Sequence, residues 1–292
     1  MWHRRDVSDA GGHRDHIEDN RRNWDDRARL HARGRTGYRL DRYRDDRDLI
    51  SDVVEFDRTH LADVTGLDVL HLQCHIGTDT LSLARLGARV TGLDLSGAAI
   101  DAARTLFDSV DTPGDFVVSS VDDAVDALGA GRFDLLYTGV GAVNWLPDIA
   151  RWGRICSELL RPGGRLLLRD AHPMAVALDD TRTAEEDAVA LRLRYPYFET
   201  AEPMTFDDAL TYVDTGGEQL VHSRHHEWNH GLGEVFSALT GAGLTVTTLE
   251  EHRGLDWKML PGQVEEDGRW FLPGHQRDLC PMMYTIVAVK AT

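Results

Sequence analysis

Residues 68–96 decide the fold of this protein, and they read DVLHLQCHIGTDTLSLARLGARVTGLDLS. The segment 69–72 is short, apolar and followed by turn residues, which is typical of a buried parallel strand. A loop then leads to Gly77, and Thr78 or Asp79 can cap the helix that follows. A second strand, residues 90–95, brings Asp94 to its carboxyl end.

Parallel sheets bind ligands at the carboxyl ends of their strands, and an acid there can accept hydrogen bonds from both hydroxyls of a ribose. We therefore expect Asp94 to hold the ribose of either NAD or S-adenosylmethionine, although it could also be a helix-capping acid. A nicotinamide site uses G-x-G-x-x-G so that backbone approaches a pyrophosphate. Here Gln73 and His75 occupy positions where glycines would be expected, and Gly77 is the one glycine of the loop. The loop therefore favours S-adenosylmethionine, which has no phosphate.

The segment VLHLQCHIG at 69–77 resembles the pattern V-L-D-L-G-C-G-T-G of class I S-adenosylmethionine-dependent methyltransferases. Its variant L-H-L-Q-C-H-x-G is similar to that of a bacterial branch acting on small molecules. Further similarities are WLPD at 145–148, LRPGG at 160–164 and EWNHGLGE at 227–234. The resemblance covers the chain from about residue 24 to the C-terminus, and it is specific for fold and cofactor rather than for the acceptor.

The resemblance implies a set of cofactor-binding residues in the first loop, after the second strand and after the third, where adenine is held. The set is His71, Gln73, His75, Gly77, Asp79, Thr80, Asp94, Leu95, Ser120, Val121, Asp122 and Thr138. Structural roles compete with some of these assignments. His71 could be a hydrogen-bonded core residue, Gln73 and His75 could stabilise the loop, and Gly77 could be an ordinary turn glycine.

Alternating strand and helix patterns extend beyond this unit and predict an open sheet with helices on both faces. The fold class is therefore α/β: a Rossmann-like, doubly wound, seven-stranded sheet whose last strand is, by the resemblance, antiparallel. The remaining strands are expected at 116–119, 133–138, 165–170, 244–249 and 284–289, and helices at 149–159 and around 232–239.

We expect three regions along the chain. Residues 1 to about 22 are charged or small and are expected to be a disordered leader. Residues 23–64 carry helical patterns at 24–32 and 48–63, which the resemblance interprets as a lid over the cofactor; a helix packed on the sheet edge is the alternative. Residues 65–292 form the methyltransferase domain, with an insertion at about 174–226.

The composition limits the function. The 292 residues carry a net charge of −17, which repels phosphate backbones and disfavours nucleic-acid partners. No apolar run approaches the ~18 residues of a membrane span. Three well-separated cysteines, and a first segment without a signal-peptide core, predict a reduced cytoplasmic protein. We expect it to be a monomer or a homodimer.

The insertion is expected to build the acceptor pocket over the sheet edge, with possible strands at 210–213 and 219–228. Candidate acceptor-binding residues are Tyr38, Tyr43, Asn144, Trp145 and Tyr195. Methyl transfer from a sulfonium needs in-line positioning and, for a protonated acceptor, a base. His172, His226 and Tyr197 are the candidate catalytic residues. A zinc site is disfavoured, because His222 and His226 would lie about 13 Å apart along a strand.

The sequence thus predicts O- or N-methylation of a small molecule, for example in secondary metabolism, with S-adenosylmethionine as cofactor. Two alternatives stay open. One is C-methylation or a methylation-coupled cyclisation by the same cofactor. The other is a protein that binds the cofactor, has lost catalysis and acts as a partner or sensor.

Overall fold

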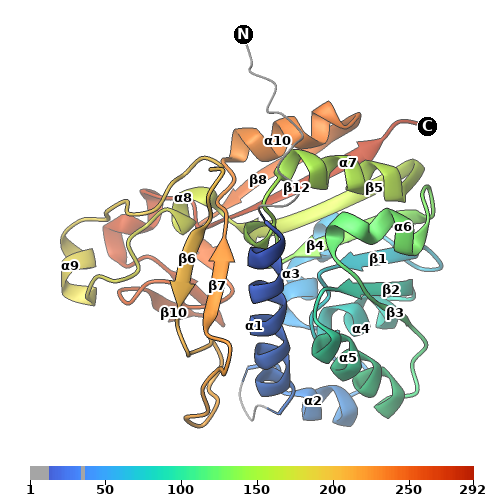
Figure 1. Cartoon of the computed structure of the whole chain (residues 1–292), viewed down its shortest axis with the longest axis horizontal. Coiled ribbons are helices and arrows are strands. Elements are labelled where there is room, and N and C mark those ends of the chain that lie inside the picture. Colours follow the sequence, from blue (N-terminus) through green and yellow to red (C-terminus); the bar gives the residue numbers. More distant parts are fainter. Residues whose placement is uncertain (1–12, 34–36) are drawn as a thin grey trace.

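The structure, a computed structural model, describes residues 13–33 and 37–292 (Figure 1). Its centre is a seven-stranded sheet in the order β3-β2-β1-β4-β5-β12-β8. The strands are β1 (Asp68–Leu72), β2 (Arg89–Asp94), β3 (Asp115–Val118), β4 (Phe133–Gly139), β5 (Leu160–Ala171), β8 (Leu244–His252) and β12 (Met283–Lys290). Neighbouring strands pair in parallel along the series β3, β2, β1, β4 and β5. The strand β12 pairs antiparallel with both β5 and β8. The predicted Rossmann-like sheet is confirmed.

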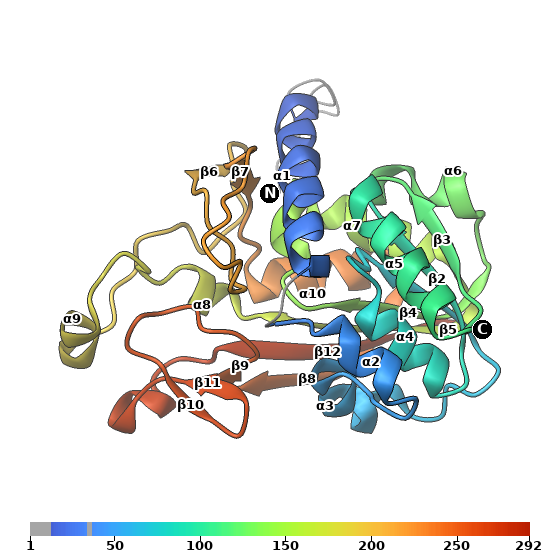
Figure 2. The same cartoon turned by 90° about the horizontal axis from the view of Figure 1, so that it is seen from below.

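Helices cover both faces of the sheet, as the two views show (Figure 2). One core contains Val69 of β1 and the apolar faces of the helices before and after it; the other contains Leu70 and Leu72. This alternation follows from the two-residue period of a strand. The helices on the first side are α2 (Leu40–Asp45), α3 (Asp52–Leu61), α4 (Thr78–Arg85) and α5 (Gly97–Ser109); those on the second are α6 (Ala124–Leu128), α7 (Ile149–Leu159) and α10 (Leu232–Gly241).

The N-terminal arm is more ordered than the sequence predicts. The helix α1 (Arg14–Arg33) has 20 residues, so it begins inside the segment 1–22 that we expected to be disordered; residues 1–12 lie outside the described part. Ion pairs between residues three or four apart stabilise a helix in this charged stretch. Arg21, for example, lies 2.8 Å from Glu18 and 2.7 Å from Asp25. The helix stands between the sheet and the insertion (Figure 1).

The insertion contains less strand than predicted. It holds α8 (Pro173–Val176), α9 (Ala184–Val189) and a hairpin of β6 (Met204–Asp207) with β7 (Arg224–Glu227). The predicted strands at 210–213 and 219–228 are wrong, except for the four residues of β7. Residues 210–213 make side-chain contacts instead of a ladder: the Tyr212 hydroxyl bonds that of Tyr38 at 2.7 Å.

A second small sheet joins β9 (Gly254–Leu255), β10 (Val264–Glu266) and β11 (Arg269–Phe271). Three short 3-10 turns, η1 (Val121–Asp123), η2 (Val143–Trp145) and η3 (Gly274–Asp278), complete the elements. Among the helices of the described ranges, none is long and apolar enough to cross a membrane.

Candidate functional site

A cavity of about 2910 Å³ runs along the carboxyl ends of β1, β2, β4 and β5. Pockets for single small ligands usually measure ~300–1000 Å³, so this one has room for two ligands side by side. Its lining comes from the loops of the sheet, from α1 and the arm, from the insertion and from the segment around β9 to β11.

The loop after β1 keeps a glycine-like backbone without the glycines. Gln73 has a φ of 57° and His75 a φ of 49°, which non-glycine residues rarely adopt. Bonds offset the strain: Gln73 Nε2 donates to the carbonyl of Ala142 at 2.8 Å, and His75 Nε2 lies 2.8 Å from His31 Nδ1. Both side chains line the cavity, so they stabilise the loop and also face a ligand.

Asp94 lies where the sequence places it, at the carboxyl end of β2 and in the cavity wall. Its two carboxylate oxygens accept the backbone N–H groups of His75 and Ser96, each at 2.8 Å. Burial raises the pKa of Asp94 to about 6. Each oxygen can accept a second hydrogen bond, so the carboxylate can hold the loop and still receive hydroxyl donors.

Two more predicted residues shape the floor. His71 Nδ1 bonds the Thr80 hydroxyl at 2.9 Å, and burial lowers the pKa of His71 to about 4, which keeps it neutral near pH 7. Burial raises the pKa of Asp79 to about 6. His71 and Asp79 line the cavity, as do Leu95, Ser120, Val121 and Asp122.

Three predicted cofactor residues lie behind the wall rather than in it: Gly77, Thr80 and Thr138. Gly77 has a φ of 81°, and a Cβ there would come 2.8 Å from the Cβ of Ala103 in α5. Packing against α5 and the positive φ are therefore sufficient reasons for a glycine at this position. Thr80 orients His71, and Thr138 is buried inside β4.

The loop after β4 is fixed by Asp170. Its buried carboxylate accepts the N–H groups of Gly141, Ala142 and Val143 at 2.6, 2.9 and 2.9 Å. The same loop supplies the carbonyl that receives Gln73. One buried acid thus sets the position of two loops at the carboxyl edge.

All five predicted acceptor-binding residues line the cavity: Tyr38, Tyr43, Asn144, Trp145 and Tyr195. Asn144 Nδ2 donates to Glu227 at 2.8 Å, and the Tyr195 hydroxyl donates to Asp180 at 2.8 Å. They come from the arm, the loop after β4 and the insertion, so these distant segments meet around one space.

The prediction for His172 is not supported by its position. The residue caps α8, where its Nδ1 accepts the N–H of Met174 at 3.0 Å. Its Nε2 lies 3.0 Å from Glu251 of β8. The ring therefore turns toward the β8 side of the sheet and does not line the cavity.

His226 and Tyr197 also lie outside the cavity lining. His226 is fully buried against α1, with Nδ1 2.9 Å from the Thr205 hydroxyl and its N–H donated to Asn20. Because alternate residues of a strand face opposite sides, the neighbours His225 and Glu227 line the cavity instead. The Tyr197 hydroxyl accepts the N–H of Leu232 at the start of α10.

Sequence reasoning missed one face of α1. Trp24 and Arg27 line the cavity, and His31 of the same face bonds His75. Their spacing of three and four residues is the available signal, together with a tryptophan in an otherwise charged helix. Trp24 contacts Trp145 edge-on, with ring centroids 5.0 Å apart.

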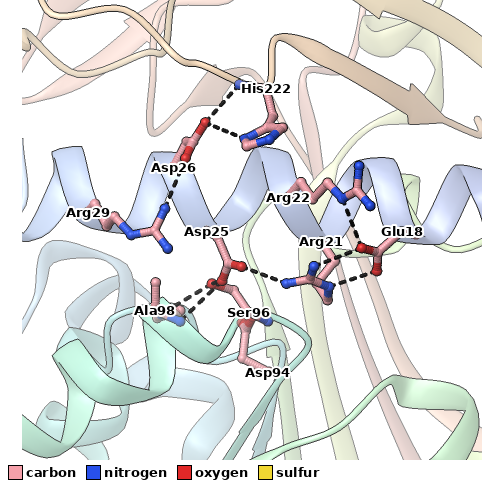
Figure 3. Close-up of polar contacts among 11 residues, drawn as sticks. Glu18, Arg21, Arg22, Asp25, Asp26, Arg29, Asp94, Ser96, Ala98 and His222 are labelled. Atoms are coloured by element: carbon pink, nitrogen blue, oxygen red, sulfur yellow. Dashed lines mark hydrogen bonds and ion pairs between the residues drawn. The ribbon is translucent and has the colours of Figure 1, made fainter.

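Two adjacent acids attach α1 to opposite partners (Figure 3). Asp25 accepts the Ser96 hydroxyl at 2.7 Å and the N–H of Ala98, at the start of α5. Asp26 accepts the N–H of His222 at 2.8 Å and also contacts its ring, in the insertion. The helix therefore ties the cofactor side of the cavity to the insertion. Among the described residues, no group of His, Cys, Asp and Glu is arranged to hold a metal ion.

Comparisons with known proteins agree with this geometry. Residues 70–166 match a family described as "Methyltransferase domain". A ubiquinone biosynthesis O-methyltransferase from Xanthomonas axonopodis is 38% identical over 99 residues, which are 33% of this chain and 41% of that protein. The chain thus spans less than half the length of the curated relatives it matches.

Solved structures share the fold over a larger part of the chain. A S-adenosylmethionine-dependent methyltransferase from Mesorhizobium loti has a TM-score of 0.57 at 20% identity and covers 81% of this chain and 96% of its own. A counterpart from Methanosarcina mazei has a TM-score of 0.53 at 17% identity, with 83% and 98% covered. Residues 70–166 thus match a methyltransferase domain, and the chain shares the fold of these S-adenosylmethionine-dependent methyltransferases.

Proposed function

We propose that this protein is an S-adenosylmethionine-dependent methyltransferase that transfers a methyl group to oxygen or nitrogen of a small molecule. The observation that carries the proposal is that the Asp94 loop and an aromatic wall from the arm and insertion face one shared cavity. The O-methyltransferase name of the Xanthomonas relative adds support for oxygen.

The residues at the sheet edge fit the cofactor. Gln73 Oε1 and His75 Nδ1 are buried atoms without a hydrogen-bond partner in the described part of the chain, so they are available to a polar ligand. Asp94 would hold the ribose hydroxyls, and Ser120 to Asp122 would border the adenine. When bound, the cofactor supplies an electrophilic methyl group on a sulfonium.

The other residues would position the acceptor and remove its proton. Trp24, Trp145 and Tyr38 would orient it, and α1 would act as the lid that keeps water out. His225 replaces His172 and His226 as the proposed base, because it lines the cavity and its Nε2 lies 3.4 Å from Glu227.

Calorimetry and mass spectrometry test the proposal. S-adenosylhomocysteine should bind and NADH should not; binding of NADH alone, or of both equally, would contradict it. With a panel of small phenols and amines, a gain of one methyl group supports transfer. Cyclisation without a retained methyl group would indicate the alternative chemistry, and cofactor binding without any turnover would indicate a sensor.

A further inference from the structure

Arg27 is a buried cation that faces the cavity without a direct ion-pair partner among the residues that the structure describes; the carboxylates of Glu227 and Asp208 act on it only across space. Its residue is 7% exposed, yet within the described ranges no Asp or Glu lies at ion-pair distance from it. Its Nε donates to Asn23 at 2.6 Å and its Nη1 to the Thr211 hydroxyl at 3.2 Å. Both partners are neutral, so most of the five guanidinium N–H donors, including those of Nη2, are left for a ligand.

The other deeply buried arginine at the sheet edge shows what this chain does when the role is structural. Arg169 is 0% exposed, and it bonds Asp57 at 2.5 Å as well as Asp256 and the carbonyl of Val53. Burying a charge is costly unless it is paired and hydrogen-bonded. Arg169 meets that condition within the protein, whereas Arg27 does not.

The surroundings of Arg27 are aromatic. Its guanidinium carbon lies 5.5 Å from the ring centre of Trp24 and 5.9 Å from that of Trp145. Tyr38 and Tyr212 complete this wall, and their hydroxyls bond each other. Flat, apolar faces next to a planar, bidentate donor suit a planar ring that carries a carboxylate.

We propose that Arg27 receives the carboxylate of an aromatic acid, and that such an acid is the methyl acceptor; this rests on the proposed function. The position of Arg27 favours a role in binding the acceptor rather than the amino-acid end of the cofactor. Its hydrogen-bond partner Thr211 belongs to the insertion, and its neighbour Trp145 follows residues 141–143, the part of the loop after β4 that Asp170 holds. The cofactor's own carboxylate is the other source of the same chemistry, and the experiment separates the two.

The test is a calorimetric titration of the S-adenosylhomocysteine-saturated protein with 4-hydroxybenzoate and with its methyl ester. The acid should bind at least tenfold more tightly than the ester. Arg27→Met keeps an unbranched side chain between the tryptophans and should abolish this preference, whereas Arg27→Lys should keep part of it. Arg22→Met is the matched control, since Arg22 is a half-exposed arginine of the same helix outside the cavity lining.

Several outcomes would overturn the inference. Equal binding of acid and ester by the unmodified protein, or no binding of either, contradicts an aromatic acid as acceptor. If Arg27→Met weakens S-adenosylhomocysteine but not 5′-methylthioadenosine, which lacks the amino-acid end, Arg27 serves the cofactor instead. Failure of the proposed function is distinguishable, because the unmodified protein would then not bind S-adenosylhomocysteine at all.

Discussion

The two walls of the cavity differ in what forms the surface turned to the cavity. The inner wall consists of the loops after β1, β2 and β4, and buried carboxylates fix its backbone: Asp94 and Asp170 accept backbone N–H groups directly. The outer wall consists of the N-terminal arm and the insertion. Asp26 joins the two by accepting the N–H of His222, but the surface turned to the cavity is formed by contacts between side chains, as in the Tyr38–Tyr212 hydroxyl pair and the Trp24–Trp145 ring contact.

This difference separates two properties of the site. Bonds from a carboxylate to main-chain N–H groups fix the loop path whichever side chains the loop carries, which is how Gln73 and His75 keep left-handed conformations. Contacts among side chains change with every substitution while the fold persists. We therefore expect the inner wall to determine cofactor binding and the outer wall to determine the acceptor.

The largest expected effect is on the inner wall. Asp94→Ala removes the acceptor of two N–H groups and the proposed partner of the ribose, and hydrogen bonds to charged groups contribute roughly 1.5–3 kcal/mol each. We expect S-adenosylhomocysteine affinity to fall about 100-fold or more, measured by calorimetry. Asp101→Ala, at an exposed acid of α5, is the control. Unchanged affinity in Asp94→Ala would show that the inner wall does not determine cofactor binding.

Asp170→Ala probes the same wall through stability. Three loop N–H groups and that of Ala171 lose their acceptor, and each unsatisfied buried donor costs about 1–3 kcal/mol unless water reaches it. Because the cavity admits water, we expect a decrease of about 2–4 kcal/mol in the free energy of unfolding, measured with urea. A decrease below about 1 kcal/mol would contradict the role of Asp170 in holding the loop.

Trp24→Leu tests the outer wall. The Trp24 ring contacts the rings of Trp145 and His75, and these contacts involve side chains rather than the backbone of the cofactor loops. We expect acceptor turnover to fall about tenfold, as for the loss of roughly 1.4 kcal/mol of binding, with S-adenosylhomocysteine affinity changed less than threefold. An equal loss in both measurements would show that the two walls are not independent.

A smaller effect is expected from pH. Burial raises the pKa of Asp79 from the usual carboxyl range to about 6. Between about pH 4 and 6, Asp79 is therefore protonated in the folded, ligand-free protein and ionised in the unfolded chain. Its stabilising contribution is complete below about pH 4 and is lost as pH rises through 6. Asp79→Asn should flatten the curve between pH 4 and 6, where one group contributes a slope of at most about 1.4 kcal/mol per pH unit. An unchanged slope in urea unfolding would refute this role.

The smallest effect on activity is expected at His172, which lies outside both walls. His172→Ala should change turnover less than threefold, while loss of the cap on α8 should lower the free energy of unfolding by about 1 kcal/mol. His172→Asn, which can keep the cap, should restore that stability. A hundredfold loss of turnover in both variants would return His172 to the list of candidate bases.

The inner wall and the sheet could be predicted from the sequence because their signals are local. The apolar runs of the strands and the acid at the end of β2 lie within a few residues of the elements they define. The left-handed loop positions also coincide with the places where glycines would be expected. The predictions at these positions therefore rest on short-range patterns.

The outer wall could not be predicted in the same way. The side of β7 that faces the protein is set by α1, about 200 residues earlier in the chain, as in the contacts of Asn20 with His226, so it could not be predicted from neighbouring residues. The sequence predicts His226 in the pocket, whereas in the structure its neighbour His225 lines the cavity. Chain order placed His172 after β5, but a cap bond and Glu251 turn its ring away.

The attachment of α1 also bears on the order in which the protein is assembled. Residues 14–33 leave the ribosome well before the insertion, and Asp26 meets its partner His222 after 196 further positions of chain. Strands β1 to β5 can pair once residue 171 has emerged, so the parallel part of the sheet can form before α1 meets the insertion. This helix, which lines the cavity, is therefore synthesised before the segment that completes its attachment.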